Sequence, residues 1–251
     1  MKTLPSLDAH AHIDPSRPSD ELTDTGVVLA MTFALDGGAV AIQRREPHIV
    51  WGVGCHPRFL KAETSFNKEQ FRALAEKTAV AGEVGLDTGS RVPFETQVRT
   101  LRQILDVISD LPRIVSIHSY RASGPLLKEL RRRTVSVPIL HWWTGSAAET
   151  SEAVKLGCYF SIHSAVARQS KFRTRVPLER ILVESDHGYG DPPAAIPLRV
   201  GWVEHLVAQQ YGIDVKELRR IVWRNFAAVV QKTGTLDLLP ELFTSTIASI
   251  A

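Results

Sequence analysis

The sequence predicts an α/β fold, a single (β/α)8 TIM-type barrel that spans residues 1–251. Three observations favour it. The length of 251 residues is typical of one such barrel. Eight short apolar runs, rich in Val, Ile and Leu and without strict alternation, indicate parallel strands buried on both faces. Longer amphipathic stretches separate these runs, as right-handed βαβ units require. An open doubly wound sheet has the same alternation and remains an alternative.

The eight expected strands share an apolar composition and a length of four to seven residues. They are Leu4–Asp8, Val27–Phe33, Ile49–Gly54, Val80–Glu83, Ile114–His118, Val137–Trp142, Cys158–Ile162 and Arg180–Glu184. No internal repeat or interdomain linker interrupts the alternation, so we expect one domain.

The helices are predicted from apolar residues at helical spacing. They are Phe66–Lys77, Pro93–Asp110, Leu126–Arg133, Ala147–Leu156, Ile196–Tyr211 and Val215–Gln231. Pro93 suits a first helical turn, Ser146 and Asp214 suit N-caps, and Gly157 suits a helix end. The segment 186–197 reads as an ordered surface loop, and the residues after Thr235 as a short terminal helix.

The composition is that of an ordinary globular protein, with 44% hydrophobic and 23% charged residues. A net charge of +3 allows an anionic substrate without requiring one. Cys55 and Cys158 match no zinc or disulfide spacing, which suggests a reducing compartment. The first residues do not resemble a signal peptide, and no segment has the length of a membrane span. We therefore expect a cytoplasmic protein without a membrane partner.

Polar side chains stand at or just beyond the ends of the expected strands. Because the carboxyl ends of barrel strands converge on one face, these side chains should meet there. His10 and His12, two apart on an extended chain, point to the same side. The full set is His10, His12, Glu83, His118, His141 and Asp186. Each residue alone is explained by a turn, a cap or a core hydrogen bond; their shared position favours a metal site.

Four imidazoles and two carboxylates suit one or two divalent cations, Zn²⁺, Mn²⁺ or Mg²⁺. A bound cation can lower the pKa of water from about 15.7 to about 7, which supplies hydroxide without a protein nucleophile. We expect Glu83 and Asp186 to be the catalytic carboxylates, since one can bridge two cations and the other can orient the attacking water. Glu184 is a nearby alternative ligand.

Six pieces with a shared order along the chain carry a resemblance to a known family. They are Leu7–Asp14, Gly52–Pro57, Gly82–Asp87, Ser116–Ser119, Leu140–Ser146 and Val183–Asp186. With these residues the sequence resembles the TatD-family metal-dependent deoxyribonucleases, within the amidohydrolase-like barrels. Trp223–Phe226 is similar to the family's C-terminal asparagine motif. His141–Ser146 and Gly157–Ser161 resemble most the TatD-like component of Qat anti-phage defence cassettes.

The resemblance implies two linked metal sites. His10, His12, Glu83 and Asp186 would serve one; His118 and His141 would serve the other, with Glu83 bridging. It also implies hydrolysis of DNA phosphodiester bonds at single-stranded or free ends, and protein partners from a defence cassette. The sequence departs from the family at Thr88, Tyr120 and His187, which leaves the ligands intact and changes residues beside them.

The residues expected to contact substrate surround the same mouth. They are His56, Arg58, Arg121, Trp142 and His187. Cations would hold phosphates, and one of Trp142 and Trp143 would stack on a base while the other packs outward. Lys61, Arg168, Lys171, Arg173, Arg175 and His163 are further candidates, each equally well explained as a solvated residue.

Two other functions remain open. One is a small-molecule hydrolase that cleaves an amide, ester or lactone, although no lysine ends a strand where a carbamylated ligand would stand. The other is a subunit of a defence complex whose activity depends on its partners.

Overall fold

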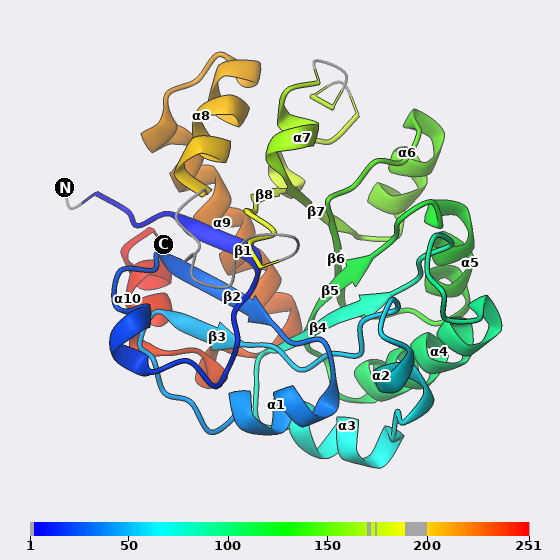
Figure 1. Cartoon of the computed structure of the whole chain (residues 1–251). Coiled ribbons are helices and arrows are strands. Elements are labelled where there is room, and N and C mark those ends of the chain that lie inside the picture. Colours follow the sequence, from blue (N-terminus) through cyan, green and yellow to red (C-terminus); the bar gives the residue numbers. More distant parts are fainter. Residues whose placement is uncertain (1–2, 170–171, 174, 189–199, 251) are drawn as a thin grey trace.

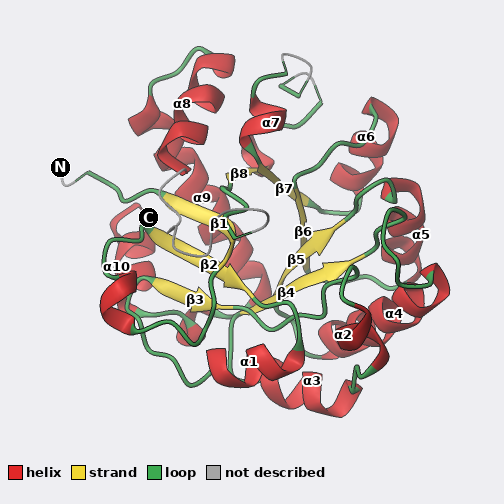
Figure 2. Cartoon of the chain, in the orientation of Figure 1, coloured by secondary structure: helices red, strands yellow, loops and turns green. Residues whose placement is uncertain are grey.

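The computed structural model describes residues 3–169, 172–173, 175–188 and 200–250. Strands occupy the centre of the molecule and helices surround them (Figures 1 and 2). The strands are β1 Leu7–His12, β2 Val27–Met31, β3 Ile49–Trp51, β4 Val80–Gly85, β5 Ile114–His118, β6 Val137–His141, β7 Tyr159–Ile162 and β8 Ile181–Val183. All observed pairs are parallel, β1 to β3 in one run and β4 to β8 in the other.

The α-helices follow the strands in βα order for most of the chain. They are α1 Leu35–Ala41, α2 Leu60–Thr64, α3 Lys68–Ala75, α4 Phe94–Asp110, α5 Ser123–Arg132, α6 Ala147–Lys155, α7 Ser164–Ala167, α8 Val200–Tyr211, α9 Val215–Thr233 and α10 Glu241–Ile250. Short 3₁₀ helices lie at Ser19–Leu22, Leu178–Arg180 and Leu236–Leu238. None of the helices within the described ranges is both long and apolar enough to span a membrane.

Two irregular seams join the runs of strands into a barrel. Between β3 and β4, Val53 donates to Val80 and accepts from Gly82, and Cys55 donates to Glu83. Between β8 and β1, the amide of Asp186 donates to His10 at 3.0 Å and the amide of His12 donates to His187 at 2.6 Å. The expected barrel is therefore confirmed, and the open-sheet alternative is wrong.

The last helices close the barrel wall. Trp223 and Phe226 of α9 are buried and meet the ring of Phe243 from α10 at 6.1 and 5.9 Å between centroids. Asn225 donates to the carbonyls of Leu178 and Ile181, where β8 begins. This asparagine satisfies backbone groups at the start of the strand that leads to Asp186.

Most expected elements are present with shifted ends. Ser146 and Asp214 are N-caps as expected, and the side chain of Ser146 forms a capping box with Glu149. Pro93 precedes α4 as its N-cap and does not occupy the first turn. The terminal helix after Thr235 is α10. The loop expected over 186–197 and the start of the helix expected from Ile196 lie outside the described residues beyond position 188.

The largest error concerns the first strand. It was expected at Leu4–Asp8 and lies at Leu7–His12, so His10 and His12 stand within the strand and not after it. Its register shifts between Asp8 and Ala11, and β4 shifts likewise between Ala81 and Val84. Such irregularities re-aim side chains, and both occur in strands that carry candidate metal ligands.

Candidate metal centre

Glu83 lies at the centre of a buried cluster of imidazoles. Its Oε1 is 2.7 Å from Nδ1 of His118 and 2.9 Å from Nε2 of His141. Its Oε2 is 2.9 Å from Nε2 of His12 and 3.3 Å from Nε2 of His10. Each carboxylate oxygen therefore faces one pair of histidines, in the division that two linked sites would have.

Asp186 completes the cluster from the end of β8. Its Oδ1 lies 3.7 Å from Nε2 of His10 and 3.8 Å from Nε2 of His12. Donor atoms of His10, His141 and Asp186 also lie within 4.8 Å of one another. The structure thus brings all six predicted ligand residues together, with His10 adjacent to both halves.

Glycines allow the strand that carries Glu83 to approach its neighbours. A Cβ on Gly82 would lie 2.6 Å from Sδ of Met31. A Cβ on Gly85 would lie 2.1 Å from the carbonyl oxygen of His118, and the φ of Gly85 is +147°. Larger side chains at these positions would push β4 away from β5 and displace Glu83.

Hydrogen bonds outside the cluster orient three of the imidazoles. Nδ1 of His12 is 3.2 Å from the carbonyl oxygen of Met31. Nε2 of His118 is 2.9 Å from Oδ2 of Asp87, and Nδ1 of His141 is 3.3 Å from Oε1 of Glu184. Because carbonyl and carboxylate oxygens only accept, each of these nitrogens carries a proton. In the neutral tautomer, the other nitrogen of each ring directs its lone pair at Glu83.

This arrangement requires positive charge between the rings and the carboxylate. Both oxygens of Glu83 and Oδ1 of Asp186 are buried, and none of the described groups gives them a hydrogen bond of acceptable geometry. Two ligands of one cation, each about 2.1 Å from it, lie roughly 3.0–3.4 Å apart at octahedral to tetrahedral angles. Most separations around Glu83 are near this range. The donor set therefore fits divalent cations.

The ionisation behaviour of the protein groups reflects the same crowding. Burial and the neighbouring His141 lower the pKa of His10 to about 4. Burial, reinforced by the carboxylates of Glu83, Glu184 and Asp8, raises the pKa of Asp186 well above its usual range. Burial opposes protonation of His141, but Glu83 and Glu184 outweigh it and raise its pKa well above the usual value. Such opposed shifts in one cluster are typical of functional sites.

The cluster opens into a cavity of about 290 Å³. Its lining combines metal-type ligands with aromatic and polar side chains from the strand-end loops. The residues are His56, Arg58, Glu83, His118, Ser119, Tyr120, His141, Trp142, Thr144 and Asp186. A small molecule or the end of a chain could enter this space.

Two lining residues adopt a backbone conformation that is unusual for non-glycine residues. Trp142 has φ +41° and Asp186 has φ +48°. The amide of Trp142 donates to Oε1 of Glu184 at 2.8 Å, and the amide of Asp186 donates to His10. Left-handed backbone costs on the order of 1–3 kcal/mol at such residues and persists where surrounding contacts hold it. The fold holds both residues at the cavity in this way.

The two adjacent tryptophans take opposite positions. Trp142 lines the cavity, and its ring lies 3.8 Å from that of His163. Trp143 is buried, and its Nε1 donates to Thr150 at 2.9 Å. This is the division expected from alternation, with one ring at the mouth and the other packed outward.

Three of the five expected substrate residues line the cavity: His56, Arg58 and Trp142. The other two do not. Arg121 is exposed, and its guanidinium lies over the ring of Tyr120 at 5.2 Å. His187 is buried, and its carbonyl accepts from the amide of His12, so it supports the β1–β8 seam. Neither residue is among those that line this cavity, and their expected contact with substrate stays a prediction.

The further cations also lie away from this lining. Arg173 donates to the carbonyl of Gln210, and Arg175 donates to the carbonyl of Gly145. Lys61 belongs to α2, and Arg168 is the C-cap of α7. Lys171 lies outside the described residues.

His56 contributes more than the sequence suggested. Its Nε2 is 3.4 Å from Oε2 of Glu83, and its Nδ1 accepts the amide hydrogen of Arg58 at 3.1 Å. In the neutral ring Nε2 therefore carries the proton and acts as a donor. Burial lowers the pKa of His56 to about 3, which favours that neutral form.

Asp87 and Glu184 orient imidazoles and were not predicted in that role. Asp87 ends the Gly82–Asp87 piece, and Glu184 lies two residues before Asp186. Glu184 was considered as an alternative ligand, but it lies behind His141 and accepts from Ser161 with its other oxygen. Their position within four residues of a candidate ligand in the sequence was the signal that could have predicted this role.

Comparison with known proteins gives a consistent result. The family model described as "TatD related DNase" matches residues 7–231. The Escherichia coli K12 protein named "Uncharacterized metal-dependent hydrolase YcfH" is 28% identical over 88% of this chain and 94% of its own length. The crystal structure of the TatD homologue YJJV from Escherichia coli has a TM-score of 0.77 at 20% identity, over 89% of this chain and 97% of that one.

Two mammalian relatives have nuclease names. The mouse "Putative deoxyribonuclease TATDN3" is 27% identical over 64% of this chain and 58% of its own length. The human "3'-5' RNA nuclease TATDN2" is 30% identical over 56% of this chain and 20% of its own length. This chain thus spans little more than half of the first protein and a fifth of the second.

Proposed function

The chain belongs to the family of TatD-related DNases, and on that premise we propose that it is a metal-dependent nuclease that hydrolyses phosphodiester bonds at DNA ends. The observation that carries the proposal is the placement of Glu83, with each carboxylate oxygen 2.7–3.3 Å from two imidazole nitrogens. A hydrolase with bridged divalent cations needs such a carboxylate.

The proposed ligands form two groups that share Glu83. His10, His12 and Asp186 would hold one cation together with Glu83, and His118 and His141 would hold the other together with Glu83. When bound, divalent cations lower the pKa of a water molecule and neutralise charge on phosphoryl oxygens. Zn²⁺, Mn²⁺ and Mg²⁺ are the candidates.

The chain's own residues orient the reactants. Asp186 lines the cavity, where its carboxylate can align a water molecule and accept its proton. Asp87 and Glu184 fix the rings of His118 and His141. His56 directs Nε2–H toward the cluster and can donate it to a phosphoryl oxygen. The guanidinium of Arg58 and the ring of Trp142 line the entrance, one for a phosphate and one for a base.

The size of the cavity supports cleavage at strand ends. About 290 Å³ is the lower limit for sites that enclose a small molecule. A terminal nucleotide fits such a volume better than the middle of a strand, since a continuous strand needs two exits. We therefore propose exonucleolytic cleavage, with single-stranded DNA as the preferred substrate.

The test is a nuclease assay on metal-depleted protein with Mg²⁺, Mn²⁺ or Zn²⁺ restored in turn. Single-stranded DNA with free, 5′-blocked or 3′-blocked ends gives polarity, and a matched RNA strand gives sugar preference. Glu83→Ala and Asp186→Asn should each reduce the rate at least about 100-fold, whereas Asp24→Asn on the surface should not. Full activity in either site variant, with wild-type metal content, would refute the mechanism.

The small cavity also favours a second candidate, a hydrolase of a small amide, ester or lactone. The role of the metal would be the same, because a cation polarises a carbonyl oxygen as well as a phosphoryl oxygen. A panel of lactones, esters and amides beside the DNA substrates separates the two. Turnover of a panel compound at least about 100-fold above that of DNA would favour the second function.

We further propose a role in anti-phage defence together with cassette-encoded proteins. The support is the motif His141–Ser146, of which Trp142 and Thr144 line the cavity. Co-expression with the neighbouring genes should yield a co-purifying complex. If the isolated chain is silent on DNA and the complex is active, partner-dependent activity is the correct reading.

A further inference from the structure

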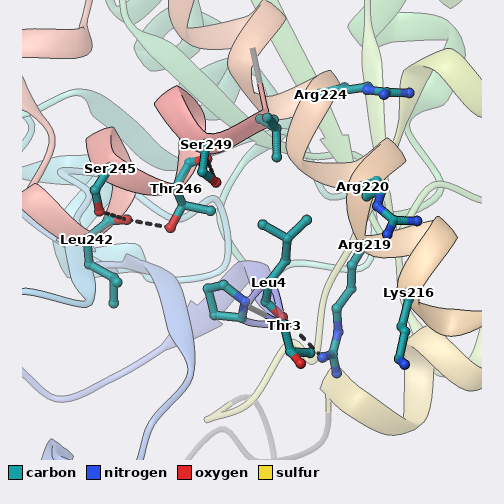
Figure 3. Close-up of a pocket in the computed structure, with 12 residues that line it drawn as sticks. Thr3, Leu4, Lys216, Arg219, Arg220, Arg224, Leu242, Ser245, Thr246 and Ser249 are labelled. Atoms are coloured by element: carbon teal, nitrogen blue, oxygen red, sulfur yellow. Dashed lines mark hydrogen bonds between the residues drawn. The ribbon is translucent and has the colours of Figure 1, made fainter. Parts of the chain in front are cut away.

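A second, larger hollow lies beside the N-terminal end of β1. It has a volume of about 770 Å³ and is walled by the segment that precedes β1 and by the helices α9 and α10. In Figure 3 the basic side chains extend from α9 on one side, the hydroxyl side chains lie along α10 on the other, and Leu4 lies between them. We call this hollow the basic groove.

The walls of the basic groove are fixed by specific contacts. Nη1 of Arg219 donates to the carbonyl of Leu4 at 3.2 Å, and Nε1 of Trp223 donates to the carbonyl of Pro5 at 2.9 Å. On the other side, the buried ring of Phe243 holds α10 against α9. The groove is therefore formed by packed elements and does not need a ligand to shape it.

Three cations along α9 have no acidic partner within the described parts of the chain. Lys216, Arg220 and Arg224 line the groove and are exposed. The nearby carboxylate of Glu204 is already engaged, since it accepts from Arg219 through both oxygens at 2.8–3.0 Å and from Ser6 at 3.0 Å.

Several exposed arginines elsewhere on the barrel wall are paired with carboxylates. Arg72 lies near Glu76, Arg102 bonds Glu129 in a two-pronged contact, and Arg131 lies near Glu152. The basic groove thus concentrates positive charge that the protein does not neutralise itself. Such a concentration attracts anions.

The spacing of the cations specifies the kind of anion. Positions 216, 220 and 224 are one helical turn apart, so the row extends over about 12 Å at about 6 Å per step. On the opposite wall the hydroxyls of Ser245 and Ser249 donate to backbone carbonyls within α10, and Leu4, Leu242 and Ile250 supply apolar surface. A row of cations beside apolar groups suits a ligand with several phosphates in sequence.

From these observations we infer that the basic groove is a second binding site, for a ligand that carries consecutive phosphates. The chemistry is shared by a nucleoside polyphosphate and by a stretch of single-stranded nucleic acid. The groove borders residues 3–5, whereas His10 lies about six residues further along β1, or roughly 20 Å at about 3.3 Å per residue. The site is therefore separate from the metal centre and does not depend on the proposed nuclease activity.

The experiment is calorimetric titration of the metal-depleted full chain in chelator and low salt. The probes are inorganic tripolyphosphate, adenosine triphosphate and a twelve-nucleotide single-stranded DNA. The double variant Arg220→Gln with Arg224→Gln removes two exposed cations without touching Arg219. The matched control is Lys128→Gln with Arg132→Gln, which removes two exposed cations one turn apart on α5.

Wild type and the α5 control should bind alike, and the α9 variant should bind at least about tenfold more weakly. For the DNA probe, the logarithm of the association constant decreases as the logarithm of the salt concentration rises. This slope should be smaller in magnitude by about 1.4 in the α9 variant, because two phosphate contacts are lost. Binding of tripolyphosphate and adenosine triphosphate identifies a small ligand as the source, and binding of DNA alone identifies a strand. Equal affinities of wild type and the α9 variant, or no binding of any probe, would overturn the inference.

Discussion

Replacing Asp87 with asparagine tests whether the carboxylate behind His118 controls metal binding. Asp87 is fully buried, and its Oδ2 is 2.9 Å from Nε2 of His118. Its Oδ1 accepts the amide hydrogen of Gly89 at 2.7 Å. Burial opposes ionisation of Asp87, but the hydrogen bonds from His118 and Gly89 outweigh it and lower its pKa. In Asp87→Asn the negative charge is lost while an oxygen acceptor for Gly89 remains.

The expected magnitude follows from this division of roles. Loss of a carboxylate that orients a metal-binding histidine typically weakens metal affinity by 10–100-fold, which corresponds to about 1.4–2.7 kcal/mol. Because Asn preserves the contact to Gly89, its free energy of unfolding without metal should change by less than about 1 kcal/mol. Asp87→Ala also removes the acceptor of the part-buried hydrogen bond from the Gly89 amide and should cost about 0.5–1.5 kcal/mol of stability as well.

The assay is competition for Zn²⁺ or Mn²⁺ against a chromophoric chelator, with urea denaturation of the metal-depleted proteins beside it. Asp24→Asn serves as the surface control. The expected loss of metal affinity requires that His118 is a metal ligand, as proposed. A metal affinity of Asp87→Asn within about twofold of wild type, with the fold intact, would refute it.

Three further predictions concern stability. Chelation should lower the melting temperature by about 5–10 °C, since saturation at 100 times Kd contributes about 2.7 kcal/mol; an unchanged melting temperature after verified metal loss would contradict a folded-state metal site. Burial raises the pKa of Glu63 to about 7, so the folded state binds this proton more tightly and stability falls as pH rises from about 4.5 through 7. Glu63→Gln should therefore be more stable than wild type at pH 8, by up to about 3 kcal/mol, and similar near pH 4; an equal difference in urea midpoints at both pH values would exclude this titration. Phe243→Ala removes the buried contact of α10 with Trp223 and Phe226 and should cost about 3–5 kcal/mol in urea denaturation, and a cost below 1 kcal/mol would show that α10 is not part of the core.

Local sequence located the strands that are buried on both faces. Ile114–His118 was placed without error, because an apolar run between turn residues has few alternatives. Leu4–Asp8 was misplaced because β1 continues through His10 and His12, whose polar side chains face the cluster. An apolar pattern predicts that a strand ends before polar residues such as these histidines. In the folded protein the two histidines are buried around the candidate metal centre and belong to the strand.

The spacing of apolar residues did not predict the short helices. The helices α1, α2 and α7 span seven, five and four residues, too few for helical spacing to repeat. Glu63 belongs to α2 and is buried, so its ionisation, which affects stability, could not be predicted from the sequence pattern. Such segments form because the barrel packs against them, and isolated helices of that length are unstable in water.

The sequence by itself determined the barrel and the six residues that meet at its mouth, because strand ends of a parallel barrel converge whatever the loops do. Only the tertiary structure decided how these residues are arranged around one another. It placed Glu83 between two pairs of imidazoles, put Asp87 and Glu184 behind two of their rings, and left Arg121 and His187 out of the cavity lining. It also joined Leu4 to a row of cations more than 200 residues later in the chain. Chain reversals and side-chain directions of this kind depend on packing between distant segments, which no local pattern records.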